Sequence, residues 1–300
     1  MWKILVQTFT DFQDDKCTRI AAALSYYTIF SLAPLLTLAM AIGGLVLDPD
    51  DVQGKIEQQV KALVGEDGAQ QVRTMINAAE GGPLTGGDEN SDQRTGIFAT
   101  VISSSVLLVG LIGMIGQMQA AMNDVWEVKP DPDQSFWKRI IVSRLLSFGM
   151  LAAAGFLLMV SLLLSAAITL VGDSISDIAP GLASETLLRV VNFSLSFVVI
   201  TALFAAIFKY LPDAKVGWYD VAVGSAVTAI LFVVGKSLIG LYLGSKNMES
   251  TYGAAGSLAL LLTWIYYSSI IFLLGAEFTQ AWAKIRGDGI EPSKFAVKVE

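Results

Sequence analysis

The 300-residue chain contains no histidine and only one cysteine, Cys17. Histidine is the commonest general base and a frequent zinc ligand, so its absence removes the most usual hydrolytic and zinc sites. A single cysteine excludes an internal disulfide bond. Serine or tyrosine nucleophiles would have to be activated by carboxylates or lysines, and no such pairing stands out in the sequence. We therefore predict that the chain is not an enzyme and binds no metal or cofactor.

Charged residues are scarce as well. They make up 16% of the chain, whereas hydrophobic residues make up 54%, and the net charge is −7. Soluble domains carry about 25% charged residues. A nucleic-acid partner would require a basic face, so the acidic balance argues against one. The apolar residues are collected in long runs, and about 20 such residues suffice to cross a bilayer. The composition therefore predicts an integral membrane protein surrounded by membrane lipids.

Six apolar runs predict an all-α, polytopic protein with six transmembrane helices. The runs cover approximately residues 20–47, 97–118, 141–171, 188–208, 218–243 and 254–276. With their connections they form a transmembrane domain of residues 20–283. Lys and Arg are concentrated before the first run, after the second and fourth, and after the sixth. By the positive-inside rule, both termini and these connections face the cytoplasm.

Three segments outside the runs complete this organisation. In residues 1–19, apolar side chains recur at helical spacing, which fits either a helix lying on the membrane surface or a short helix packed on the protein. The outward loop 48–96 begins with apolar residues at helical spacing and continues as an acidic, glycine-rich tether. It therefore predicts short amphipathic helices in its first part. Residues 284–300 are expected to form a cytoplasmic tail.

The first run contains the stretch SYYTIFSLAPLL, residues 25–36, whose polar groups are unusual in a membrane span. Pro34 lacks a backbone donor and clashes with the carbonyl of Phe30, which predicts a kinked first helix. Two interpretations remain open for this stretch. Either Ser31 or a water satisfies the freed carbonyl, or the face of Tyr27, Ser31 and Pro34 lines an interior cavity.

Polar and charged residues within or beside the apolar runs are the candidate cavity-lining or substrate-binding residues. A charge within a span is costly and rare. Lys236 either snorkels to the outer interface or faces a cavity or an anionic head group. Glu277 and Arg144 fit interfacial positions, a relay, or a pair across the bundle. The full set of candidates is Tyr26, Tyr27, Ser31, Pro34, Ser103, Arg144, Lys236, Tyr242, Thr263, Tyr266 and Glu277.

Four blocks of the sequence resemble, in order, the signature of the YihY/BrkB family of bacterial inner-membrane proteins. They are DKCTRIAAALSYYTIFSLAPLL (15–36), AMNDVWEVKP (121–130), YLPDAKVGWYDVAVGSAVTAILF (210–232) and STYGAAGSLALLLTWIYYSSIIFLLGAEFTQAW (250–282). The resemblance implies six transmembrane helices in the bacterial cytoplasmic membrane. It supplies no agreed catalytic residues, and the family's biochemical role is poorly settled.

Two functions are compatible with these features. The first is transport or translocation of a lipid or other amphiphile for envelope maintenance, because the runs carry polar groups at membrane depth. The alternative is a non-transporting scaffold that binds a periplasmic or envelope protein through loop 48–96. Either function is compatible with a homo-oligomer.

Overall fold

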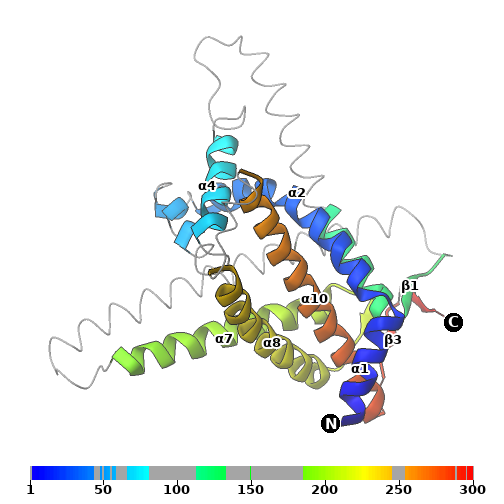
Figure 1. Cartoon of the computed structure of the whole chain (residues 1–300). Helices are drawn as coiled ribbons and strands as arrows, with labels where there is room; N and C mark the ends of the chain where they lie inside the picture. The colour runs from blue at the N-terminus through cyan, green and yellow to red at the C-terminus, as the bar shows by residue number, and fades with distance from the viewer. Residues whose placement is uncertain are drawn as a thin grey trace. The chain divides into compact units, whose positions relative to one another are not determined.

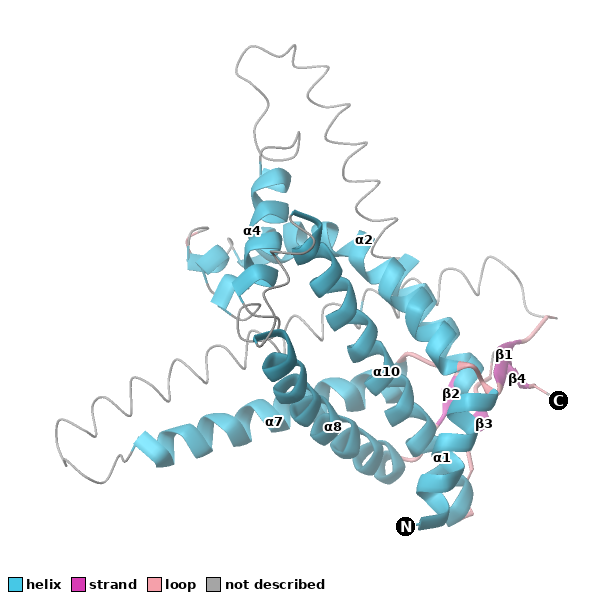
Figure 2. Ribbon diagram, in the orientation of Figure 1, coloured by secondary structure: helices cyan, strands magenta, loops and turns pink. Residues whose placement is uncertain are grey.

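The structure is a computed structural model, and most of the residues that it describes are helical (Figures 1 and 2). Of the predicted spans, 141–171 lies outside the described residues except for residue 149, and only the end of 97–118 is described. The described residues are 2–43, 48, 51–54, 56–58, 66–80, 113–132, 149, 185–244, 254–287, 289–294 and 296–299.

Three of the described helices are long and apolar enough to cross a membrane. They are α7 (Glu185–Tyr210), α8 (Trp218–Gly244) and α10 (Ala254–Arg286). Their positions match the fourth, fifth and sixth predicted spans, and α10 extends ten residues beyond the predicted end at 276. The total of six spans and the cytoplasmic placement of both termini stay predictions.

The first predicted span corresponds to α2 (Cys17–Gly43), which is helical through Pro34. The hydroxyl of Ser31 donates to the Thr28 carbonyl at 2.9 Å and lies 3.1 Å from the sulfur of Met114. Ser31 therefore satisfies the carbonyl three residues earlier, and not that of Phe30. The kink itself stays a prediction.

Contacts divide the chain into two compact units. The first contains residues 1–15, 122–233 and 274–300, and the second contains residues 16–121 and 234–273. Helices α8 and α10 contribute one part to each unit. The units are described separately below.

In the first unit, α8 and α10 pack through a reciprocal pair of glycines and threonines. A Cβ atom added to Gly224 would collide with the Thr279 hydroxyl, and one added to Gly275 would collide with the Thr228 hydroxyl. Both threonines are fully buried, and each donates to the carbonyl of the glycine four residues earlier at 2.7 Å. Small residues at this spacing allow membrane helices to approach closely. The sequence GxxxT therefore sets the crossing from both sides.

Helix α1 (Trp2–Asp14) packs against the same end of α10. Ile4 forms a buried cluster with Phe278 and Ala281, and three partly buried residues surround it, namely Val223, Val227 and Trp282. Of the two placements predicted for residues 1–19, packing on the protein is therefore observed for one face of this helix.

The described residues are mostly helical, as predicted, and two short β-ladders accompany the helices. Strand β1 (Val128–Pro130) pairs antiparallel with β4 (Ala296–Lys298), and β2 (Ala214–Lys215) pairs antiparallel with β3 (Glu291–Pro292). Figure 2 shows both ladders close to the C-terminus. α10 ends at Arg286, beyond the predicted start of the tail at 284. Gly287 then takes a positive φ of 97°, a conformation that glycine adopts easily. The tail is thereby folded onto two connections between helices.

In the second unit, α4 (Glu66–Glu80) packs on the end of α2. Leu36, Val72 and Ile76 form its buried cluster. Arg73 pairs with Glu57 at 3.4 Å, which ties α4 to the helical residues 56–58. These elements agree with the amphipathic helices predicted for the outward loop. The predicted tether at 81–96 lies outside the described residues.

Candidate functional site

Polar and charged side chains, half of them buried, gather in the first unit, where four parts of the chain meet. They come from the elbow after α1, the turn after helical residues 113–125, the connection between α7 and β2, and the last turns of α10. We call this group the polar junction. Its members are Asp15, Asn123, Trp126, Glu127, Asp213, Glu277, Gln280 and Lys284.

Asn123 and Asp213 join two of these parts by two hydrogen bonds. The backbone N–H of Asp213 donates to Asn123 Oδ1 at 2.8 Å, and Asn123 Nδ2 donates to Asp213 Oδ2 at 2.9 Å. Asn123 is buried, and these two bonds satisfy both the oxygen and the nitrogen of its side-chain amide inside the protein. The carbonyl of Asp213 also accepts from the backbone N–H of Ser293 at 2.9 Å. One aspartate thus links the connection to the turn and to the tail.

Trp126 is buried in the same turn. Its side chain is 2% exposed, its Nε1 donates to the carbonyl of Ala276 at 3.2 Å, and its ring lies edge-on to that of Phe208 with centroids 6.3 Å apart. The indole therefore fixes the turn against α10 one residue before Glu277.

Glu127 carries the strained backbone of the turn and an ion pair. Its φ is 54°, in the left-handed region that non-glycine residues seldom occupy. Lys284 Nζ lies 2.9 Å from Glu127 Oε1, and this hydrogen bond lowers the pKa of the Glu127 carboxyl, with a smaller contribution from Gln280. The backbone carbonyl of Glu127 accepts from Val299 at 2.8 Å. Strained residues of this kind persist where surrounding contacts over-determine them.

Asp15 and Glu277 place two carboxyl groups in contact. Glu277 is fully buried and Asp15 is partly buried, and a side-chain hydrogen bond joins the two. Burial raises the pKa of the Asp15 carboxyl, and the charges of Glu127 and Asp11 act in the same direction. The Glu277 hydrogen bond and Lys284 oppose these effects. Arg144, the other partner considered for Glu277, lies outside the described residues.

A second ion pair lies elsewhere in the same unit. Arg286 Nη1 is 3.2 Å from Oδ1 of the buried Asp220, and the guanidinium stands over the ring of Tyr219 at 4.4 Å. Lys209 stands over the ring of Trp218 at 5.3 Å. Both rings are exposed. Aromatic rings combined with cations at helix ends are typical of the membrane–water boundary.

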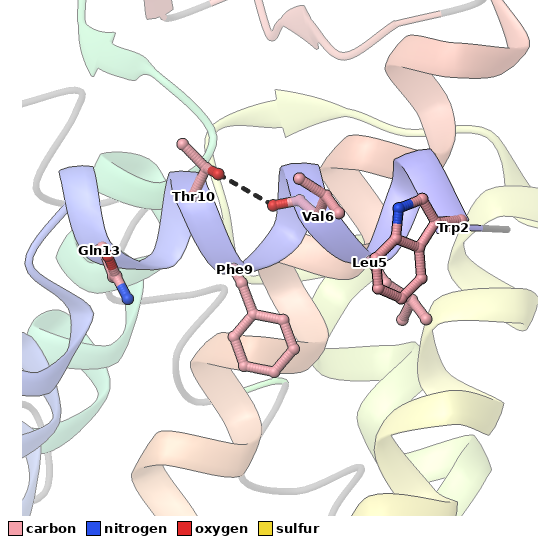
Figure 3. Close-up of a pocket in the computed structure, with 6 residues that line it drawn as sticks. All are labelled: Trp2, Leu5, Val6, Phe9, Thr10 and Gln13. Carbon is pink, nitrogen blue, oxygen red and sulfur yellow. Dashed lines mark hydrogen bonds between the residues drawn. The ribbon is translucent and has the colours of Figure 1, made fainter.

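The face of α1 that does not pack against α10 is apolar and exposed. Trp2 is 78% exposed and Phe9 is 57% exposed, and both rings project from the helix in Figure 3. They border a hollow of approximately 330 Å³, whose lining is completed by Leu5, Val6, Thr10 and Gln13. Contact of this exposed face of α1 with the membrane surface stays a prediction.

The two tyrosines of the first span are more exposed than Ser31. Tyr26 is 59% exposed and Tyr27 is 44% exposed, whereas Ser31 is buried. Whether the face of Tyr27, Ser31 and Pro34 lines a cavity stays a prediction.

The remaining predicted residues differ in their exposure. Lys236 and Tyr266 are partly buried, and Thr263 is exposed, with its hydroxyl donating to the Ala259 carbonyl at 2.8 Å. Among the described candidates, Glu277 alone belongs to the polar junction. Pro34 lies in α2 and Tyr242 lies in α8, and the structure describes their backbone but not their side chains. Ser103 and Arg144 lie outside the described residues.

Most of the polar junction was not singled out from the sequence, although a signal was present. Asp15 opens the first family-like block, Asn123 to Glu127 lie in the second, Asp213 lies in the third, and Glu277 and Gln280 close the fourth. Each of the four blocks therefore contributes at least one residue to the polar junction.

Comparisons with known proteins agree with the resemblance. A family model described as virulence factor BrkB matches residues 8–296. The chain is 26% identical to a UPF0761 membrane protein of Alkalilimnicola ehrlichii, covering 96% of this chain and 61% of that protein. It is 29% identical to UPF0761 membrane proteins of Rhodospirillum centenum and Verminephrobacter eiseniae, covering 87% and 93% of this chain and 53% and 62% of theirs. The chain thus spans between 53% and 62% of these relatives. No solved structure matches significantly.

Proposed function

Because the chain belongs to the BrkB virulence factor family of membrane proteins, we propose that it is a multi-pass protein of the bacterial inner membrane that moves a lipid or another amphiphile for envelope maintenance. The relatives are described only as membrane proteins, so the transport role and the substrate class are our own proposal. The proposal includes no chemical change of the substrate.

The position of Glu277 is the observation that supports transport. This carboxyl is fully buried within Leu258–Arg286, a stretch apolar enough to cross a membrane. Thr279 and Gln280 are buried beside it. Ionisable residues in such segments are costly and mark substrate or ion pathways. A scaffold that only binds a partner would not require a carboxyl group at this position.

The transport proposal predicts that purified protein in phospholipid vesicles accelerates the movement of a fluorescently labelled phospholipid between leaflets. We expect Glu277→Gln, which keeps the size of the side chain and removes its acid–base chemistry, to slow this movement about tenfold or more, an effect of about 1.4 kcal/mol on the barrier. The measurement is the rate at which a membrane-impermeant reductant quenches the labelled lipid.

Glu291→Gln provides the matched control for this experiment, because Glu291 is an exposed glutamate on β3. It should transport at the rate of the unmodified protein. Equal rates in vesicles with and without the unmodified protein would refute lipid movement as the function.

The alternative proposal, a scaffold for an envelope protein, has support of its own from α4. Its inner face is buried on α2, while Thr74 and Asn77 are exposed on the outside. Deleting this helix would uncover Leu36, so a less disruptive test is required. A photoreactive residue at position 74 is expected to cross-link to an envelope protein in cells, whereas the same residue at Val72, which is 1% exposed, should not. A correctly inserted protein without a product from position 74 would contradict the scaffold proposal.

A further inference from the structure

Four large apolar side chains, Trp2, Leu5, Val6 and Phe9, form an exposed strip on one side of α1, which we call the apolar strip. Each residue turns a helix by about 100°, so Trp2 and Phe9, seven residues apart, lie about 20° apart around the axis. Both rings leave the helix on the same side (Figure 3). Leu5 and Val6 lie between them and are 43% and 48% exposed. Soluble proteins seldom expose a contiguous group of this kind unless a partner or a membrane covers it.

The opposite side of α1 fixes how far the helix lies from the ends of α8 and α10. Ile4 and Phe278 belong to one buried cluster, and Val223 packs against it. Val223 lies five residues after Trp218, the first residue of α8, or about 7 Å at 1.5 Å per residue. Phe278 lies eight residues before Arg286, the last residue of α10, or about 12 Å. Both helices therefore place α1 inward of their own ends.

These helix ends carry the side chains expected where a membrane meets water. Lys209 stands over the exposed ring of Trp218, and Arg286 stands over the exposed ring of Tyr219. Trp and Tyr are enriched at the level of the lipid head groups. Interfacial helices bury their apolar face about 5–10 Å into the boundary between head groups and acyl chains. The position of α1 relative to these rings agrees with that depth, and the apolar strip faces away from α10.

A hollow along the apolar strip suits a hydrocarbon chain better than a polar ligand. It measures approximately 330 Å³ and is bordered by the rings of Trp2 and Phe9 (Figure 3). Only Thr10 and Gln13 bring polar groups to its lining. The hydroxyl hydrogen of Thr10 is already used, because it donates to the Val6 carbonyl at 3.0 Å. The lining is otherwise apolar.

We propose that α1 lies between the protein and the bilayer, with the apolar strip inserted into the adjoining leaflet and the hollow occupied by the acyl chain of a phospholipid. Lys3 is exposed and is the only charged residue among positions 2–10, so it places a positive charge beside the strip for the lipid phosphate. This contact requires that α8 and α10 cross the membrane. It does not depend on the proposed movement of lipid.

Spin labelling of the full chain in vesicles of phosphatidylcholine and phosphatidylglycerol tests the insertion. A nitroxide is attached at Phe9→Cys and, as the matched control, at Gln7→Cys, which is exposed on the same helix about 160° from Phe9. Cys17 is fully buried, so the label attaches to the introduced cysteine. The ratio of collisions with oxygen to collisions with a polar nickel chelate should be about tenfold higher at position 9, because hydrocarbon excludes polar solutes.

Two results would overturn the insertion. Equal ratios at positions 7 and 9 would mean that the apolar strip faces water. A label at position 9 that neither oxygen nor the nickel chelate reaches would mean that protein covers the strip, either another part of this chain or a second copy. Far-ultraviolet circular dichroism verifies that both labelled variants are folded.

Photoreactive phospholipids test the hollow in the unmodified protein and need no substitution. With a diazirine on the acyl chain, mass spectrometry should locate adducts on Leu5, Val6 and Phe9 in preference to Gln7. With the diazirine on the head group, the adducts should move to Lys3. Adducts from the head-group probe alone would place α1 above the acyl chains and would refute the proposed site.

Val6→Phe separates a chain held in the hollow from general contact with the bilayer. The larger side chain occupies part of the hollow, so the acyl-chain adducts on Leu5 should be lost while the head-group adducts on Lys3 persist. An unchanged yield on Leu5 would refute a chain in the hollow. Neither measurement records movement of lipid between leaflets, so failure of this site and failure of the transport proposal are distinguishable.

Discussion

Gly224→Ala is expected to lower the free energy of unfolding of the first unit by about 3 kcal/mol, at the upper end of the cost of overpacking. The added methyl would collide with the Thr279 hydroxyl and lie 2.8 Å from its Cβ, closer than neighbouring side chains pack. Replacing glycine by alanine also favours the helix by about 1 kcal/mol. A large net loss of stability would therefore come from disrupted packing between α8 and α10. Thermal unfolding in detergent, followed by circular dichroism, measures the effect.

Two further variants establish that the crossing causes this loss. Gly224→Ala combined with Thr279→Gly exchanges the small residue from one helix to the other, and we expect it to restore part of the lost stability. Gly116→Ala adds the same methyl where no described atom outside its own helix backbone lies within 4 Å, and it should be neutral or slightly stabilising. Equal stability of Gly224→Ala and Gly116→Ala would show that α8 and α10 do not pack through these residues.

Trp126→Ala is expected to destabilise the polar junction by about 3–5 kcal/mol, the usual cost of removing a buried tryptophan. The side chain is 2% exposed, and its loss would leave a cavity beside Phe208 and remove the hydrogen bond to the Ala276 carbonyl. Trp126→Phe keeps an aromatic ring and loses the hydrogen bond and part of the ring volume, so its cost should be smaller, about 1–2 kcal/mol. Chemical denaturation in detergent distinguishes the two values.

Trp2→Ala is the comparison for Trp126→Ala. Trp2 is 78% exposed, so its removal should change the free energy of unfolding by less than about 0.5 kcal/mol. If Trp126→Ala destabilised the protein no more than Trp2→Ala, the turn would not depend on the indole, and Trp126 would not be what stabilises the polar junction.

Hydropathy was sufficient to place α7, α8 and α10, because a helix that spans a bilayer must be apolar along most of its length. It did not reveal the crossing of α8 and α10, since the glycines and threonines that form it are common in membrane helices. The two ladders were missed for a different reason. Strands of two or three residues, such as β2, are too short to show an alternating pattern, and their partners lie far along the chain.

The candidate site was predicted less well than the helices. Tyr27 and Ser31 were placed on one inward face by their spacing, but spacing alone does not say which neighbours cover a helix. Glu277 was selected because a charge beside an apolar run is rare. Its partner, Asp15, lies before the first run and has no pattern of its own. That contact depends on where α1 packs, which is a tertiary fact.

The contacts of Trp126 also bear on how the protein is made. Its partner, Ala276, lies 150 residues later in the chain, and the tail strands that cover the turn at Glu127 are later still. At a synthesis rate of about 5–20 residues per second, the turn waits about 10–30 s for these partners. The cytoplasmic side of the first unit, on our topology, is therefore completed only after α10 has emerged from the ribosome. During that interval the unpaired β1 edge and the indole of Trp126 are open to chaperones and proteases, so synthesis that stops before α10 would leave a recognisably unfinished protein.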